Sequence, residues 1–152
     1  MTGRILYYLI WPLLWFYSPL TRRVRVVITY DNQVLLVQNW IGPGRWELPG
    51  GGIKFGESTE DAAIREIREE LHLHIEDVRK LSSQPITVKK GGIMQRVEYL
   101  QAAISPDDEI VQNWEIAKVS WLPIGELETA RVMPPSIRES VTSSAALEDD
   151  TL

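Results

Sequence analysis

Apolar positions alternate with polar ones in several short runs after residue 22, which is typical of β-strands. β-Branched residues recur over residues 24–30 and 34–37, and the Asp31-Asn32 pair between these runs has the chemistry of a tight turn. We therefore expect a β-hairpin here. Three later runs also predict strands: residues 86–89, 93–104 and 118–122.

Residues 57–71 follow a helical pattern instead. Ala, Leu, Glu and Arg are frequent, and Ser58 stands three residues before Asp61, as in a capping box. One stripe of apolar side chains at helical spacing should face the core: Ala63, Ile64, Ile67 and Leu71. Residues 123–130 and 136–142 predict two shorter helices, and residues 143–152 a disordered acidic tail.

A second face of the predicted helix gathers three carboxylates, those of Glu66, Glu69 and Glu70. Neighbouring like charges on a helix repel, so the cluster favours a bound cation, and hard divalent ions prefer oxygen ligands. A glycine-rich loop over residues 48–52 precedes the helix. The alternative is a solvated acidic face balanced by Arg65 and Arg68.

Composition narrows the chemistry further. The 152 residues carry 16 Lys and Arg against 21 Asp and Glu, and the net charge of −5 gives no global attraction for nucleic acid. We therefore expect no nucleic acid polymer as a partner. The absence of cysteine excludes thiol nucleophiles and cysteine-based zinc sites. His72 and His74 alternate with apolar residues as on a short strand, and without a third ligand they make a poor zinc site.

The N-terminal segment, residues 1–20, is apolar and rich in aromatic residues. Its 16-residue core, residues 5–20, would span about 24 Å as a helix, less than a hydrocarbon layer of roughly 30 Å, and Pro12 interrupts it. Two interpretations stay open. The segment is either a shallow membrane anchor followed by the basic residues Arg22, Arg23 and Arg25, or an apolar arm packed on the domain or on the second subunit of a homodimer.

The spacing around the acidic helix resembles the Nudix box, G-x5-E-x7-R-E-U-x-E-E-x-G-U, in which U is a bulky aliphatic residue and x is any residue. Gly51, Glu57 and the run from Arg65 to Leu73 meet every fixed position but one, since His72 stands where the family has glycine. The similarity extends from about Arg22 to about Val141, so residues 21–142 are predicted to form the domain. The resemblance implies an α/β fold, an α/β/α sandwich around a mixed sheet.

The resemblance also implies a role for each site residue. Glu66, Glu69, Glu70 and the carbonyl of Gly51 would bind Mg²⁺ or Mn²⁺, with Glu57 at the edge of the site. Arg65 would orient the carboxylates, and either Glu69 or Glu115 would act as the base.

The activity implied is hydrolysis of a diphosphate bond in a nucleoside diphosphate linked to another group, a small-molecule substrate in the cytoplasm. Arg45, Trp46 and Phe55 border the presumed cleft and are candidates for substrate binding. The alternative is a non-catalytic nucleotide-binding or regulatory module with the same fold. The N-terminal segment would associate this module with a membrane if it is an anchor.

Overall fold

The computed structural model describes residues 22–41, 44–90, 93–105 and 109–149. Its elements in chain order are β1 (Arg22–Tyr30), β2 (Gln33–Asn39), β3 (Trp46–Glu47), α2 (Thr59–Leu71), β4 (Arg79–Lys80), β5 (Ile86–Lys90), β6 (Ile93–Ala103), β7 (Ile116–Pro123), the 3-10 helix η2 (Ile124–Glu126), α3 (Leu127–Ala130) and α4 (Pro135–Asp149).

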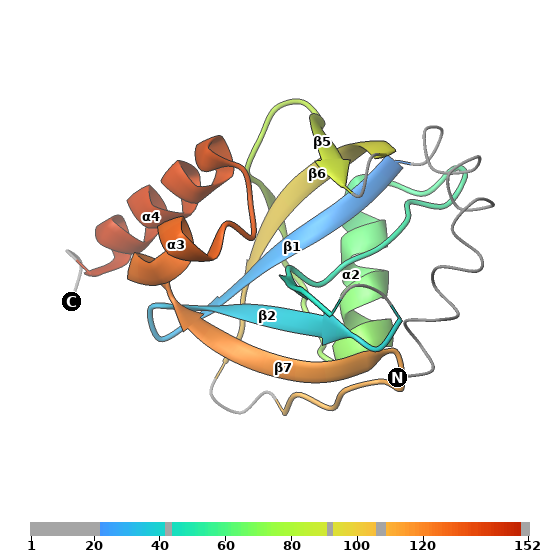
Figure 1. Cartoon of the computed structure of the whole chain (residues 1–152), viewed down its shortest axis with the longest axis horizontal. Coiled ribbons are helices and arrows are strands. Elements are labelled where there is room, and N and C mark those ends of the chain that lie inside the picture. Colours follow the sequence, from blue (N-terminus) through green and yellow to red (C-terminus); the bar gives the residue numbers. More distant parts are fainter. Residues whose placement is uncertain (1–21, 42–43, 91–92, 106–108, 150–152) are drawn as a thin grey trace.

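The strands form one mixed sheet of seven, with the order β3-β2-β1-β6-β4. The labelled strands β2, β1 and β6 can be followed in Figure 1. Strand β5 pairs with β6, and β7 pairs with β2. Only β1 and β6 are parallel, whereas the remaining pairs are antiparallel. The predicted hairpin of β1 and β2 is confirmed. Asp31 and Asn32 both have positive φ, 45° and 56°, as a two-residue hairpin turn requires.

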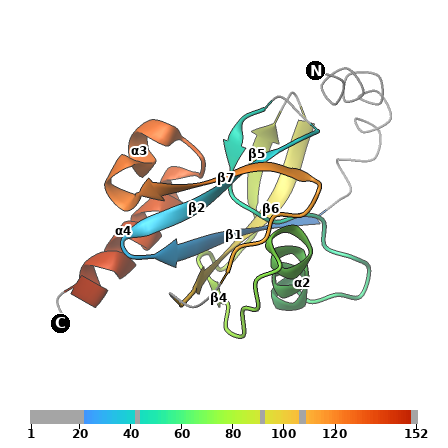
Figure 2. The same cartoon turned by 90° about the horizontal axis from the view of Figure 1, so that it is seen from below.

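Helices cover both faces of this sheet. Helix α2 lies on one face, and α3 and α4 lie on the other, as Figures 1 and 2 show from two directions. Each face has its own apolar core. Ile28 and Val37 pack with Ile67 of α2, whereas Val27 and Leu36 pack with Ile137 of α4. The predicted α/β/α sandwich around a mixed sheet is confirmed.

Helix α2 begins and ends much as its sequence indicates. The Ser58 hydroxyl accepts a hydrogen bond from the Asp61 amide at 3.0 Å, which caps the first turn. Ala63, Ile67 and Leu71 of the predicted stripe are fully buried, and Ile64 packs partly against the same core. The helix packs on the sheet through this stripe, which fixes the position of α2 relative to the loop before it.

The loop before α2 takes over one edge of β1. Strand β2 pairs with β1 only at Thr29 and Tyr30. Farther back along β1, the amides of Val24 and Val26 donate to the carbonyls of Gly51 and Pro49 at 2.9 and 3.0 Å. The glycine loop is therefore pinned to the sheet rather than free.

Two predictions were wrong. Helix α4 continues to Asp149, so residues 143–149 are not a disordered tail. The Ser143 and Ser144 hydroxyls donate to the carbonyls one turn back, and Ser144 also accepts from Arg79 at 2.9 Å. Residues 72–75 form no strand. Leu73 and Ile75 are buried and the histidines exposed, but His72 adopts the left-handed conformation that ends α2.

The predicted anchor or arm, residues 1–20, lies outside the described residues, so both interpretations of it stay predictions. No helix within the described ranges is long and apolar enough to cross a membrane. The three basic residues that follow belong to β1. Arg22 forms an ion pair with Glu98, Arg23 is partly buried, and Arg25 is buried. Arg25 is therefore not part of an exposed basic cluster.

Candidate active site

The glycine loop and helix α2 meet closely at two glutamates. The Gly50 amide donates to Oε2 of Glu70 at 2.9 Å, in a buried contact. A Cβ atom on Gly51 would lie only 2.5 Å from the carboxylate atoms of Glu66. Gly50 has a φ of 126°, and a Cβ there would lie 2.5 Å from the Val24 carbonyl oxygen. Gly51 therefore lets the loop backbone come within contact distance of Glu66, and Gly50 lets the same backbone approach strand β1.

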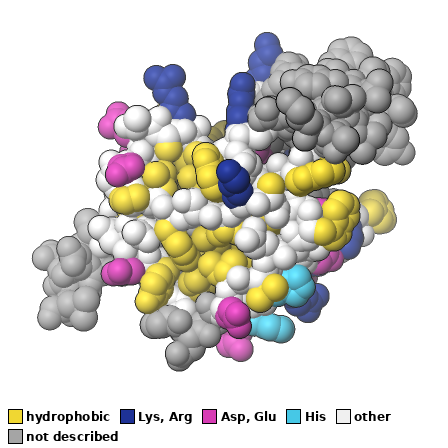
Figure 3. Space-filling model, turned by 60° about the horizontal axis from the view of Figure 1, so that its bottom comes forward, with side chains coloured by type: hydrophobic (Ala, Val, Ile, Leu, Met, Phe, Trp, Pro, Cys, Tyr) yellow, Lys and Arg dark blue, Asp and Glu magenta, His cyan; other side chains and the backbone are white. Residues whose placement is uncertain are grey.

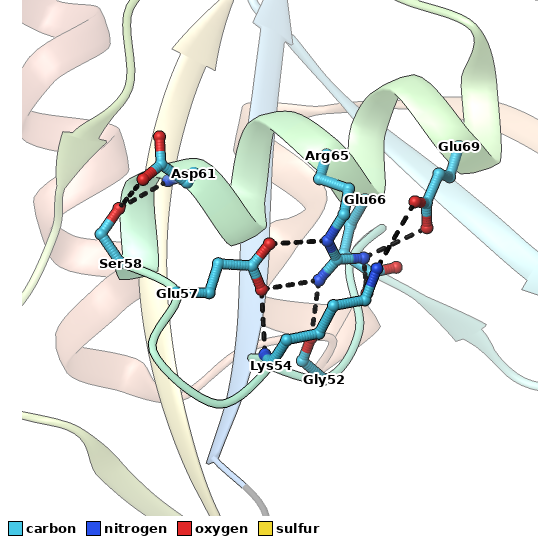
Figure 4. A network of polar contacts seen from close by, with 8 residues as sticks. All are labelled: Gly52, Lys54, Glu57, Ser58, Asp61, Arg65, Glu66 and Glu69. Carbon is cyan, nitrogen blue, oxygen red and sulfur yellow. Dashed lines mark hydrogen bonds and ion pairs between the residues drawn. The ribbon is translucent and has the colours of Figure 1, made fainter.

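Arg65 lies between the carboxylates of Glu57, Glu66 and Glu69 (Figure 4). Its Nε and Nη2 donate to the two oxygens of Glu57 at 2.7 and 2.9 Å, in a bidentate pair. Its Nη1 donates to Glu66 at 2.8 Å and to Glu69 at 3.1 Å, and Nη2 also donates to the Gly52 carbonyl at 2.9 Å. Arg65 thus contacts three carboxylates, and its orienting role stays a prediction.

Hydrogen bonds, charges and burial strongly shift the pKa values of two glutamates at this site, Glu57 and Glu70. Hydrogen bonds from Arg65, and then from the Lys54 amide, lower the pKa of Glu57 to about 2. Burial raises the pKa of Glu70 to about 7, although the Gly50 amide and Arg25 oppose that rise. The charges of Glu66 and Glu115 raise the pKa of Glu70 further. Glu70 is therefore a carboxylate that lacks a sufficient positive partner.

The predicted metal ligands do not converge on one point. Among the described side chains, no three from Asp, Glu, His or Cys are grouped so that they could hold one ion. Glu66 and Glu69 both bind Arg65, whereas Glu70 is directed to the Gly50 amide. The Glu69 side chain is 51% exposed, and Lys54 lies 3.9 Å from it.

Glu115 comes to this site through a segment that the sequence did not single out. The amides of Val111 and Asn113 donate to the last carbonyls of α2, those of Leu71 and Glu70, at 3.0 and 2.9 Å. The Asn113 side chain donates to the Glu69 carbonyl at 2.9 Å. These bonds hold the segment 111–115 at the C-terminus of α2, so the Glu115 charge acts on Glu70.

Two arginines of β1 also belong to the site, and sequence reasoning missed both. Arg25 donates to the carbonyls of Leu48 and Gly50 at 2.9 and 2.6 Å and to Glu47 at 3.2 Å. The Nε of Arg23 is buried without a hydrogen-bond partner in the described structure. Burial lowers the pKa of Arg23, while the charges of Glu47, Glu66 and Glu70 raise it. The only signal in the sequence was a run of arginines inside a β-branched strand.

A pocket of about 470 Å³ adjoins the glycine loop on the sheet face that carries α3 and α4. Arg45 and Trp46, two predicted substrate-binding residues, line it together with Leu48, Tyr99 and Met133. Arg25 lines the pocket and also binds the loop that contacts Glu70. Phe55 is fully exposed and is not part of this lining, so nothing in the structure places it at the pocket.

The donor set fits a hard divalent cation in its chemistry. The groups are carboxylates and backbone carbonyls, which Mg²⁺ and Mn²⁺ prefer. Burial is the main cause of the raised pKa of Glu70, and the charges of Glu66 and Glu115 add to it, so a bound cation would favour the charged form of this carboxyl. The Gly51 carbonyl already accepts from Val24, but a carbonyl oxygen has a second lone pair.

Together these features define an α/β/α protein with an acidic helix set against a glycine loop. The family model of the NUDIX domain matches residues 19–142, and the chain belongs to the Nudix family. The predicted family is thereby confirmed.

Relatives and solved structures agree with this assignment. The chain is 35% identical over 102 residues to an RNA pyrophosphohydrolase of Acinetobacter baylyi, a match that covers 64% of this chain and 57% of that protein. It is 27% identical over 132 residues to the NAD-capped RNA hydrolase NudC of Vibrio parahaemolyticus, which covers 84% and 45%. The chain thus spans about half the length of these relatives.

A solved structure shares the fold. The Ap4A hydrolase of C. elegans superposes with a TM-score of 0.69 at 20% identity, covering 84% of this chain and 98% of that one. At this identity the likeness supports the architecture alone.

Proposed function

We propose that the chain is a metal-dependent hydrolase that cleaves the diphosphate bond of a nucleoside diphosphate linked to another group. The buried carboxylate of Glu70 against the glycine loop is the observation that carries this proposal. A solvated acidic face would not bury one of its glutamates beside like charges. The names of the relatives, both hydrolases, support the same reaction class.

Glu66, Glu69 and Glu70 would hold the cation, with the Gly51 carbonyl beside them. A bound Mg²⁺ or Mn²⁺ supplies charge neutralisation for the diphosphate and a more acidic water. Binding requires Glu66 and Glu69 to turn from Arg65, which both contact through the same nitrogen. Arg65 keeps its bidentate pair with Glu57 and so remains in place.

The proton of the attacking water needs a carboxylate as acceptor. Glu69 and Glu115 are both exposed enough to receive it, and Glu115 lies on the segment bound to the end of α2. The nucleoside is assigned to the pocket lined by Arg45 and Trp46, where Tyr99 and Met133 supply apolar surface. The loop over residues 48–51 separates this pocket from the carboxylates.

The purified chain should be tested with Mg²⁺ and with Mn²⁺ against nucleoside triphosphates, dinucleoside polyphosphates, nucleotide sugars and 5′-triphosphorylated RNA. We expect release of phosphate, diphosphate or a nucleoside monophosphate from at least one class, and at least a hundredfold loss in Glu69→Gln. Glu128→Gln, a change of an exposed glutamate on α3, is the matched control. Tight nucleotide binding without turnover would instead support the regulatory module.

A further inference from the structure

The pocket beside the glycine loop carries more positive charge than one diphosphate site needs. Arg25, Arg45, Lys89 and Arg131 line it, and among the described lining residues Glu47 is the single acidic one. Arg25 is committed to Glu47 and to two loop carbonyls. The other three cations therefore face the pocket without a matching acid.

Arg45, Lys89 and Arg131 also lack partners elsewhere. Within the described ranges none of the three forms an ion pair or a side-chain hydrogen bond, and all three are exposed. They come from three separate parts of the chain: the approach to β3, strand β5 and the connection between α3 and α4. Three uncompensated cations around one pocket favour an anionic ligand.

The net charge of −5 conceals this arrangement. On the face drawn in Figure 3, acidic and basic side chains are scattered among hydrophobic ones, so the sign of the charge changes from patch to patch. Many of the acidic residues belong to α2 and the loop before it, on the opposite face of the sheet from α4. Local charge around the pocket decides which ligand is bound there.

The lining has two chemically distinct parts. Trp46, Tyr99 and Met133 offer aromatic and apolar surface of the kind that holds a nucleobase. The diphosphate to be cleaved is already assigned to the glutamates across the loop. The three cations are therefore available for other phosphates of the same ligand, which a mononucleotide does not have.

We propose that the pocket binds the 5′-terminal nucleotide of a phosphorylated oligonucleotide, with Arg45, Lys89 and Arg131 contacting the phosphodiesters that follow it. This inference rests on the proposed function, since it places the 5′-phosphates at the glutamates. It replaces the expectation, based on net charge, that no nucleic acid polymer is a partner.

Binding can be tested without turnover by using a reaction product. The probe is a 5′-monophosphorylated RNA hexamer with a 3′ fluorophore, titrated in Mg²⁺ at several salt concentrations and followed by anisotropy. The variant carries Arg45→Gln, Lys89→Gln and Arg131→Gln. Lys80→Gln, an exposed cation on β4 outside the pocket, is the matched control. Thermal melting of each protein establishes that it is folded.

We expect the unmodified chain to bind the hexamer at least tenfold more tightly than the matching nucleoside monophosphate. In the triple variant this preference should fall towards one. The slope of log K against log salt should become shallower by about 2, since each phosphate contact on a single strand contributes roughly 0.7. The control should keep both the preference and the slope.

The inference is overturned if the unmodified chain binds hexamer and monophosphate equally, or if the triple variant keeps the full salt slope. It is also overturned if inorganic triphosphate competes as strongly as unlabelled hexamer, because the cations would then serve a free polyphosphate. Hydrolysis of a 5′-triphosphorylated hexamer and of a nucleoside triphosphate separates the two proposals. Salt-dependent hexamer binding without cleavage of either would contradict only the hydrolase, and equal losses of both activities in the triple variant would contradict only the oligonucleotide site.

Discussion

Nδ1 of His72 lies 2.8 Å from the carbonyl oxygen of Val111 and joins the end of helix α2 to the segment that carries Glu115. Since a carbonyl can only accept, this ring nitrogen carries the proton. His72 has a φ of 53°, in the left-handed region where its family has glycine. The side-chain bond therefore offsets part of the conformational cost of a residue with a Cβ atom.

Replacing His72 should separate these two effects. His72→Ala keeps the strained conformation and loses the bond, so we expect a loss of about 1 kcal/mol in the free energy of unfolding. His72→Gly loses the bond but relieves a strain of similar size, so its stability should stay near that of the unmodified chain. Urea denaturation measures both. A larger loss in the glycine variant than in the alanine variant would contradict this account.

The same pair of variants tests the position of Glu115. In both, we expect faster amide exchange at Val111 and Asn113, whose amides bond to the end of α2. Hydrogen exchange followed by NMR provides the measurement, and His74→Ala, at an exposed histidine two residues on, is the control. Unchanged protection of both amides would show that the backbone bonds alone hold the segment.

Arg25→Met should destabilise the fold strongly. The change leaves the carbonyls of Leu48 and Gly50 and the carboxylate of Glu47 without their buried donor. Losing one partner of a buried charged network costs about 3 kcal/mol. Arg138→Met on α4, at a partly exposed arginine, should change stability by less than about 0.5 kcal/mol. Equal effects in urea denaturation would mean that Arg25 does not hold the loop.

Glu57→Gln should change how stability depends on acidity. The pKa of Glu57 is about 2 in the folded chain, below its ordinary value of 4.5. Its pairing with Arg65 therefore stabilises the fold fully above pH 4.5, and this contribution disappears as the pH falls towards 2. The difference in unfolding free energy between the unmodified chain and Glu57→Gln should follow that course. A difference that persists at pH 2 would exclude the ion pair as its source.

In protein freed of metal with EDTA, Glu70 should make the fold less stable as the pH rises, which is opposite to the effect of Glu57. Its pKa of about 7 lies above the ordinary 4.5, so the folded state binds more protons than the unfolded state between these values. Stability should therefore fall as the pH rises from 4.5 to 7, by up to about 3 kcal/mol. Glu70→Gln should remove this part of the dependence. Glu76→Gln, a change at an exposed glutamate, should keep the slope of the unmodified chain. A Glu70→Gln variant that also keeps this slope would point to another group.

Local patterns predicted those parts of the site that depend on nearby residues. Helix α2 and its capping by Ser58 follow from propensity and short-range hydrogen bonds, and the hairpin follows from Asp31-Asn32. The motif residues Glu57 and Arg65 meet each other and the Gly52 carbonyl because the loop and the helix are adjacent in sequence. In such regions, residues that are close in sequence are also close in space, so a motif spacing predicts contacts.

Long-range contacts set what the sequence could not show. The parallel pairing of β1 with β6 joins residues more than 70 positions apart, and no local pattern encodes it. Arg25 looked like a surface cation, because only the folded loop supplies its three acceptors. Asn113 looked like an ordinary loop residue, because its partners are the carbonyls at the end of α2. Residues 143–149 of the predicted tail are helical because they continue α4, which packs on the core through Val141 and Ala145.

Calorimetric titration with Mn²⁺ and Mg²⁺ tests the central claim most directly, since it reports whether the glutamates of α2 bind a divalent cation. We predict heat of binding for the unmodified chain, a loss of at least tenfold in affinity for Glu66→Gln, Glu69→Gln and Glu70→Gln, and no change for Glu128→Gln. Absence of binding in the unmodified chain, or equal affinity in all five proteins, would contradict the account.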